Sequence, residues 1–137
     1  MTKRTLIFVN GDLPNLDAAR NLICNDDFII AADGGTRHAL KLGLVPSVVV
    51  GDLDSLDAVN RRTLEEGNVE IIQYPADKNE TDLELALLYA RERGFDETLL
   101  VGAMGGRIDQ TLGNLSLLSD PVWDGVDVRI DDGIEEI

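Results

Sequence analysis

The sequence predicts an α/β fold, a doubly wound and mainly parallel sheet with helices on both faces. Short, solidly apolar runs recur along the chain between turn residues, which is typical of strands buried on both faces of a parallel sheet. Segments with helical periodicity separate these runs, and such alternation favours right-handed crossovers within one sheet. The 137 residues fit one domain, since a domain commonly contains about 100–200 residues.

The expected elements follow one another in order, and a glycine or proline ends most of them. Gly43, Gly67 and Gly94 each follow a helical segment, where glycine favours the left-handed C-terminal turn. Thr81-Asp82-Leu83-Glu84 is a capping-box sequence and opens the helix that ends at Gly94. The expected strands are Thr5–Val9, Phe28–Ala32, Ser47–Val50, Val69–Tyr74 and Thr98–Val101. The other expected helices are Asn15–Ile23, Thr36–Leu42, Leu56–Glu66 and Asp109–Leu118. Together they predict a Rossmann-like, three-layer architecture.

The last residues have a different pattern. From Val126 to Ile130, apolar and charged residues alternate, which indicates a half-exposed strand. Asp131-Asp132-Gly133 is a turn signal typical of a hairpin. We therefore expect residues 1–130 to form one domain. We expect residues 131–137 to begin a mainly β region, and the rest of this C-terminal β domain to be absent from this sequence.

The charge of the chain excludes two classes of partner. With 12 Lys+Arg and 26 Asp+Glu the formal net charge is −14, and such a surface repels nucleic acid and anionic membranes. No apolar run is long enough to span a bilayer, and the stretch before Asn10 is too short for a signal peptide. We expect a cytoplasmic protein.

Aspartates stand just after four of the apolar runs. Because parallel strands point the same way, the residues that follow them gather at one edge of the sheet, where open α/β sheets bind ligands. Clustered carboxylates repel one another unless a cation lies among them, and Mg²⁺ prefers oxygen ligands. The candidates for this cluster are Asp33, Asp52, Asp54, Asp77, Asp82 and Asp109.

Glycines and two cations near these acids indicate that the site binds an anion. The turn Gly102–Arg107 combines free backbone amides with a guanidinium, and the glycines of Asp33-Gly34-Gly35 let a ligand approach the backbone. Lys78 is a cation in acidic surroundings, and a phosphate would account for it. The set predicts a nucleotide-polyphosphate site, although the Walker sequence Gly-x-x-x-x-Gly-Lys-Ser/Thr is absent.

Several of these features also have a purely structural interpretation. Asp52 and Asp54 are typical of turns whose carboxylates accept backbone amides and cap a helix. The helix dipole favours Asp82 in the first turn by ~0.3–1 kcal/mol. The glycine-rich segment is also compatible with a plain tight turn. We interpret His38 as a surface residue on the outer face of its helix.

Four motifs in series carry a resemblance to a known family. They are Asp33-Gly34-Gly35, Gly51-Asp52-Leu53-Asp54-Ser55, Lys78-Asn79-Glu80-Thr81-Asp82-Leu83-Glu84-Leu85-Ala86 and Gly105-Gly106-Arg107-Ile108-Asp109. In this order and at these intervals they resemble the catalytic, ATP-binding domain of thiamin pyrophosphokinase, over nearly the whole chain. The resemblance implies transfer of pyrophosphate from ATP to thiamin, giving thiamin diphosphate and AMP. It also implies Mg²⁺, a homodimer and a C-terminal β domain that helps form the thiamin site.

The resemblance assigns roles to individual residues. Asp52 and Asp54 would hold Mg²⁺ with help from Asp82, while Asp33 and Asp109 would line the nucleotide and substrate site. The residues that would bind ATP are Gly34, Gly35, Lys78, Thr81, Gly105, Gly106 and Arg107. Two positions depart from the family pattern: Asn79 stands where many members have Asp, and Gln110 stands where many bacterial members have His.

Two other functions remain open. A phosphatase would use Asp52 of Asp52-x-Asp54 as a nucleophile and would need no ATP. A nucleotide- or metal-sensing domain would bind ATP with Mg²⁺ and never turn over. The kinase is favoured because the four motifs keep their order. Without the β domain, we expect the chain to bind ATP but not to complete the reaction.

Overall fold

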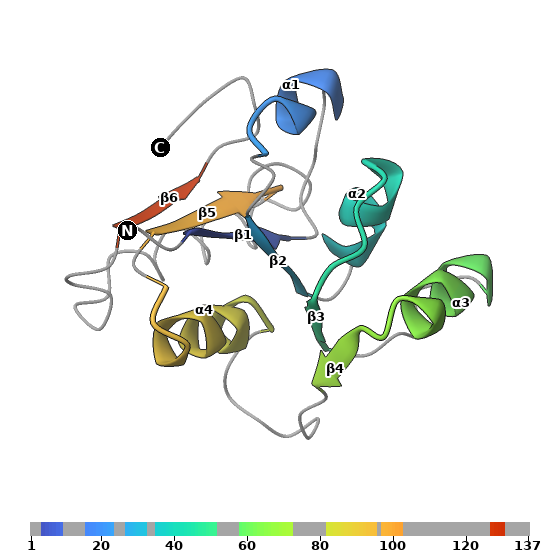
Figure 1. Ribbon diagram of the computed structural model, residues 1–137. Helices are drawn as coiled ribbons and strands as arrows, with labels where there is room; N and C mark the ends of the chain where they lie inside the picture. Colours follow the sequence, from blue (N-terminus) through green and yellow to red (C-terminus); the bar gives the residue numbers. More distant parts are fainter. Residues whose placement is uncertain are drawn as a thin grey trace.

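A computed structural model describes residues 4–9, 16–23, 27–32, 35–51, 58–72, 82–95, 97–102 and 127–130. The strands are β1 (Arg4–Phe8), β2 (Phe28–Ala32), β3 (Val48–Val50), β4 (Glu70–Ile72), β5 (Glu97–Val101) and β6 (Asp127–Ile130). The helices are α1 (Leu16–Arg20), α2 (Gly35–Lys41), α3 (Ala58–Glu66) and α4 (Asp82–Glu92). In this part of the chain the strands form one parallel sheet of order β4-β3-β2-β1-β5-β6, with helices on both faces (Figure 1). The predicted fold class is confirmed.

The central strands are solidly apolar because helices cover both of their faces. Every residue of β3 is buried, and in β1, β2 and β5 only the first residue is not. Strand β4 lies at the edge and is more open, with Ile71 37% exposed. The solid runs therefore mark the middle of the sheet, as expected for a parallel arrangement.

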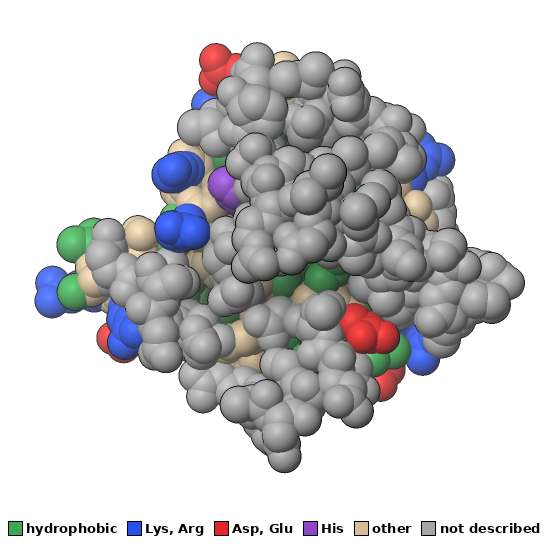
Figure 2. All heavy atoms as spheres, turned by 180° about the vertical axis from the view of Figure 1, so that it is seen from behind, with side chains coloured by type: hydrophobic (Ala, Val, Ile, Leu, Met, Phe, Trp, Pro, Cys, Tyr) green, Lys and Arg blue, Asp and Glu red, His purple; other side chains and the backbone are tan. Residues whose placement is uncertain are grey.

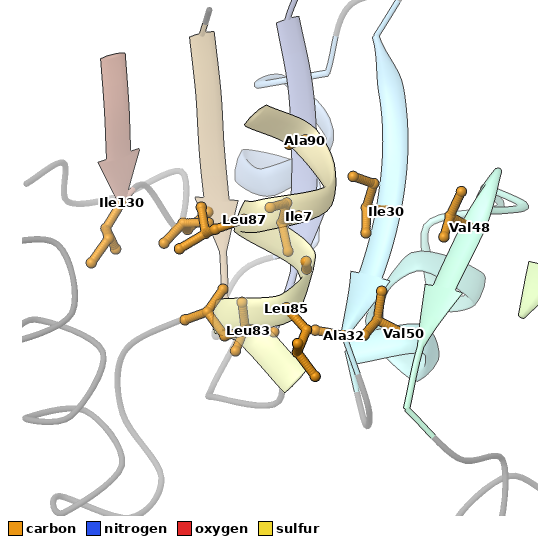
Figure 3. Packing of buried hydrophobic residues seen from close by; sticks show 13 residues of the cluster. Ile7, Ile30, Ala32, Val48, Val50, Leu83, Leu85, Leu87, Ala90 and Ile130 are labelled. Atoms are coloured by element: carbon orange, nitrogen blue, oxygen red, sulfur yellow. The ribbon is translucent and has the colours of Figure 1, made fainter. Parts of the chain in front are cut away.

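Successive side chains of a strand point to opposite faces, and this alternation divides the core into two layers. Helix α4 packs on one face, where its buried Leu83, Leu87 and Ala90 meet Ile7 and Ile30 (Figure 3). Helices α1 and α2 pack on the other face, against Leu6, Phe8, Ile29, Leu99 and Val101. Helix α3 packs on that same face over Ala31 and Val49. Each large aliphatic side chain buried in this way stabilises the fold by about 1.5–3 kcal/mol.

The alternating segment at the end of the chain belongs to the main sheet. Strand β6 runs parallel to β5, and its register pairs Leu99 with Arg129. Arg129 is exposed while Ile130 is buried against the α4 layer, so the expected half-exposed strand is present. The expected helix Asp109–Leu118 and residues 131–137 lie outside the described residues. Of the helices that the structure describes, none has the length and apolar character that a membrane crossing requires.

The strand order fixes where a ligand would bind. From β1 to β4 the chain moves stepwise in one direction, with α1, α2 and α3 on one face. It then returns past β1 to β5, with α4 on the opposite face. The order thus reverses between β1 and β5, and open α/β sheets bind ligands outside the carboxyl ends of the strands at such a point.

At the opposite, amino-terminal edge, Tyr89 links α4 to the edge strand β4. Its hydroxyl donates to Glu70, and the Arg93 guanidinium lies 4.6 Å from the centre of its ring. Burial raises the pKa of Tyr89; the negative charge of Glu70 adds to this effect, and Arg93 opposes it. The link therefore depends on a neutral phenol.

We predict that Tyr89→Phe reduces the loss of stability at alkaline pH. A raised folded-state pKa means that the phenol stabilises the fold fully below its ordinary pKa of about 10, and that this contribution is lost as the pH rises through the folded-state value. Urea unfolding from pH 8 to 11 should show a shallower decline for Tyr89→Phe than for the wild type. Equal declines would contradict the assignment.

Candidate functional site

The candidate site lies at the carboxyl edge of the sheet, where β1 and β5 end side by side. The Val9 amide donates to the Val101 carbonyl at 2.8 Å, so the two strands stay paired one residue beyond the end of β1. Val9 is buried, and Gly102 next to Val101 is buried as well. The edge at which the strand order reverses is thus a closely packed backbone junction.

Gly35 brings the start of α2 against the end of β1. A Cβ added at Gly35 would lie 2.0 Å from the Phe8 carbonyl oxygen, a distance that no side chain can occupy. Gly35 was expected to let a ligand approach the backbone. In the structure, the backbone that lies against Gly35 is that of Phe8. A glycine at such a position permits close packing of a helix on a strand.

Gly102 makes a similar approach from β5. It has a φ of +80°, which favours glycine, and a Cβ there would lie 2.6 Å from the Val9 carbonyl oxygen. The same Cβ would lie 3.3 Å from Cδ2 of His38, on α2. His38 is half-buried: it lies at the surface as expected, and its ring also lies against the backbone at Gly102. In Figure 2 the purple side chain is His38, since the chain has one histidine.

Gly51 controls the exit from β3. Its φ of +117° requires glycine, it is buried, and its amide donates to the Ile72 carbonyl at 2.9 Å. This bond ties the end of β3 to the end of β4 directly before Asp52. The sequence motifs predicted roles for Asp52 and Asp54 but none for Gly51, although a Gly-Asp pair after an apolar strand is the signal that would find it.

Two predicted site residues are among the described residues. Asp82 is the first residue of α4, and Gly35 is the first residue of α2. Gly51, the first residue of its motif, and Gly102, the first residue of the glycine-rich turn, are described as well. The other predicted site residues lie outside the described residues: Asp33, Gly34, Asp52, Asp54, Asp77, Lys78, Thr81, Gly105, Gly106, Arg107 and Asp109. Within the described part of the chain, no three His, Cys, Asp or Glu residues form a group that could hold a metal ion.

The family model described as thiamin pyrophosphokinase, catalytic domain, matches residues 19–130. The chain belongs to this family. It is 38% identical over 103 residues to the thiamine pyrophosphokinase of Bacillus subtilis (strain 168), covering 75% of this chain and 48% of that protein. It is 26% identical over 122 residues to thiamin pyrophosphokinase 1 of Caenorhabditis elegans, covering 82% of this chain and 48% of that protein. The chain therefore spans about half the length of these family members.

Solved structures of family members have the same fold. The crystal structure of thiamine pyrophosphokinase from Bacillus subtilis matches with a TM-score of 0.81 and 30% identity, over 94% of this chain and 60% of that chain. The thiamin pyrophosphokinase from Geobacillus thermodenitrificans matches with a TM-score of 0.77 and 31% identity, over 93% of this chain and 59% of that chain. The resemblance stated from the four motifs is confirmed at the level of family and fold.

We predict that Gly35→Ala destabilises this family's fold strongly, by about 3 kcal/mol or more, because the added methyl meets backbone that cannot move aside. Gly67→Ala is the matched control. Its Cβ would also make a short contact, at 2.7 Å, but with the end of the exposed Val45 side chain, which can turn away. Urea unfolding of both variants measures the difference, and similar losses of stability would show that the Phe8 contact is not limiting.

Proposed function

We propose that this chain provides the catalytic unit of a thiamin pyrophosphokinase, which transfers pyrophosphate from ATP to the hydroxyl of thiamin. The observation that carries the proposal is the match to the family's catalytic-domain model over residues 19–130, which takes in β2 to β6 and three of the four helices in full. The products would be thiamin diphosphate and AMP. We take residues 1–130 as the catalytic domain, and propose that the protein acts in the cytoplasm as a homodimer.

The position of the motifs along the chain supports a common site. In the sequence, Asp33 directly follows Ala32, the last residue of β2. Asp52 directly follows Gly51, the first residue after β3. Strands β2 and β3 are neighbours in the sheet and run in the same direction. The residues that precede the two aspartates, Ala32 and Gly51, therefore lie at the same carboxyl edge, which supports a common site.

The donor set fits Mg²⁺. Asp52, Asp54 and Asp82 offer carboxylate oxygens, the ligands that this ion prefers, and we propose that they hold it. The ion would neutralise charge on the transferred β- and γ-phosphates. For the chain's own residues, we propose that the side chains of Lys78 and Arg107 and the backbone amides of Gly105 and Gly106 bind the phosphates and hold ATP in line with the thiamin hydroxyl.

In the reaction, the thiamin hydroxyl oxygen forms a bond to the β-phosphorus while the bond from that phosphorus to the oxygen bridging the α- and β-phosphates breaks. AMP leaves with the electron pair of the broken bond. We propose that a carboxylate of the cluster, with Asp33 and Asp109 the candidates that line the substrate, accepts the hydroxyl proton. Alignment and charge neutralisation supply most of the catalysis in transfers of this type.

Mg²⁺ should stabilise the folded protein, since an ion that binds only the native state adds about 2.7 kcal/mol at a hundred times its dissociation constant. The midpoint of thermal unfolding should rise with millimolar Mg²⁺ in the wild type and stay unchanged in Asp52→Asn/Asp54→Asn. Asp17→Asn serves as the control, because the Asp17 carboxylate is 93% exposed on α1 and belongs to no proposed site. An equal rise in all three proteins would contradict the proposed metal ligands.

The purified protein, at its natural length, should release AMP from Mg·ATP only when thiamin is present. Asp54→Ala should lower the turnover by about 100-fold or more, since it removes a ligand of the charge-neutralising ion. Asp127→Ala should leave the turnover nearly unchanged, because β6 begins at Asp127 and that residue therefore lies at the opposite edge of the sheet.

Four outcomes would overturn the proposal. AMP release that is independent of thiamin, or equal effects of Asp54→Ala and Asp127→Ala, would contradict the kinase assignment. Mg·ATP binding without any turnover would instead support a sensing domain. A phosphate trapped covalently on Asp52, with no need for ATP, would support the phosphatase.

A further inference from the structure

His38 lies at the junction where the strand order reverses, although no step of the proposed reaction uses it. Helix α2 begins at Gly35 against the end of β1, and His38 is the fourth of its seven residues. Its side chain is half-buried, and the purple side chain in Figure 2 is visible on the surface. The ring is therefore neither a core residue nor a fully solvated one.

The packing around Gly102 shows what His38 contacts. A Cβ added at Gly102 would lie close to two groups. It would be 2.6 Å from the Val9 carbonyl oxygen and 3.3 Å from Cδ2 of His38. Gly102 is buried and holds a φ of +80°. The end of β1 and the imidazole of α2 together confine the residue at which the chain leaves β5.

The contact matters because of where Gly102 stands in the sequence. Gly102 opens the segment that carries Gly105, Gly106, Arg107 and Asp109. A glycine has wide conformational freedom, so without neighbours its backbone could direct this segment along several paths. The His38 ring and the Val9 carbonyl oxygen lie on the side of Gly102 where a Cβ would be, so they limit that freedom at the start of the segment.

We propose that His38 is a positioning residue for the binding of the nucleotide polyphosphate. By packing on Gly102, its ring fixes the direction in which the phosphate-binding segment leaves β5. The role requires the shape of the ring and no contact with the ligand. The proposal rests on the proposed function, because it concerns the same phosphates.

Titration of Mg·ATP into the wild type and into His38→Ala, His38→Phe and His38→Gln tests the role. His38→Ala should weaken binding about tenfold, since the loss of a group that orients binding residues commonly costs about 10–100-fold in affinity or activity at metal sites. His38→Phe keeps a planar ring on Gly102 and should bind within about threefold of the wild type. In a turnover assay the change in His38→Ala should appear in the KM for ATP, with little change in kcat.

A pair of glycine variants tests whether the close packing around Gly102, by the Val9 carbonyl oxygen as well as by His38, matters for binding. Gly102→Ala and Gly43→Ala both place a side chain at a left-handed position, with φ of +80° and +78°, so both bear similar backbone strain. A Cβ at Gly43 meets no atom within 4 Å. Gly102→Ala should therefore weaken Mg·ATP binding, whereas Gly43→Ala should lower the midpoint of thermal unfolding and leave binding unchanged.

The outcomes separate this inference from the proposed function. If the wild type does not bind Mg·ATP, the proposed function fails. If the wild type binds and His38→Ala binds equally well, only the role of His38 fails. Rescue by Gln but not by Phe would assign His38 a polar contact and overturn the packing role. If His38→Ala does not fold, two other results would overturn the packing role. One is a wild-type affinity for Mg·ATP in Gly102→Ala, and the other is a loss of that affinity in both His38→Phe and His38→Gln.

Discussion

The carboxyl end of β1 is the fixed point from which the rest of the site is built. Strand β1 pairs with β2 on one side and β5 on the other, and it is buried by helices from both faces. Two glycines from distant parts of the chain lie close to carbonyl groups at its end. Gly35 lies against the Phe8 carbonyl, and Gly102 lies against the carbonyl of Val9, the residue after β1. Because neither place has room for a Cβ, the start of α2 and the exit from β5 are located by steric contact with one strand.

Charge is used differently at the two edges of the sheet. At the amino edge, the Asp27 carboxylate is 2% exposed and lies 3.3 Å from Nε of Arg4, which also donates to the Leu22 carbonyl. This pair joins the start of β1 to the connection between α1 and β2. The carboxyl edge instead precedes the aspartate motifs. If the aspartates converge as predicted, their charges would repel one another unless a cation lies among them.

Local patterns of apolar residues were sufficient to predict the strands and helices whose surroundings stay the same along their length. The strand Phe28–Ala32 was predicted with its observed bounds, because a strand buried on both faces is apolar throughout. In α4, the predicted stripe Leu83, Ala86, Leu87 and Ala90 is buried as its spacing requires. The lateral order of strands is a long-range property, so no local signal placed Glu70–Ile72 at the edge or β6 beside β5.

The contacts of the site were harder to predict for the same reason. His38 lies on a short helix whose local pattern points it outward, and its neighbour Gly102 is remote in the sequence. Gly35 was assigned to ligand approach because the sequence shows a glycine but not the carbonyl of Phe8 beside it. The carboxylates of Asp33, Asp52, Asp54 and Asp109 lie outside the described residues, and their convergence stays a prediction that rests on strand direction and family motifs.

Backbone conformation, more than side-chain packing, sets the geometry of this edge. Gly51 and Gly102 are both buried and both have positive φ; Gly51 begins one motif of the family resemblance, and Gly102 stands three residues before another. An apolar core of interchangeable aliphatic residues holds the sheet together, and it tolerates exchange as long as volume is kept. The exits from β3 and β5 tolerate only glycine. Divergence within the family can therefore change much of the core while the directions in which the chain enters the site are retained.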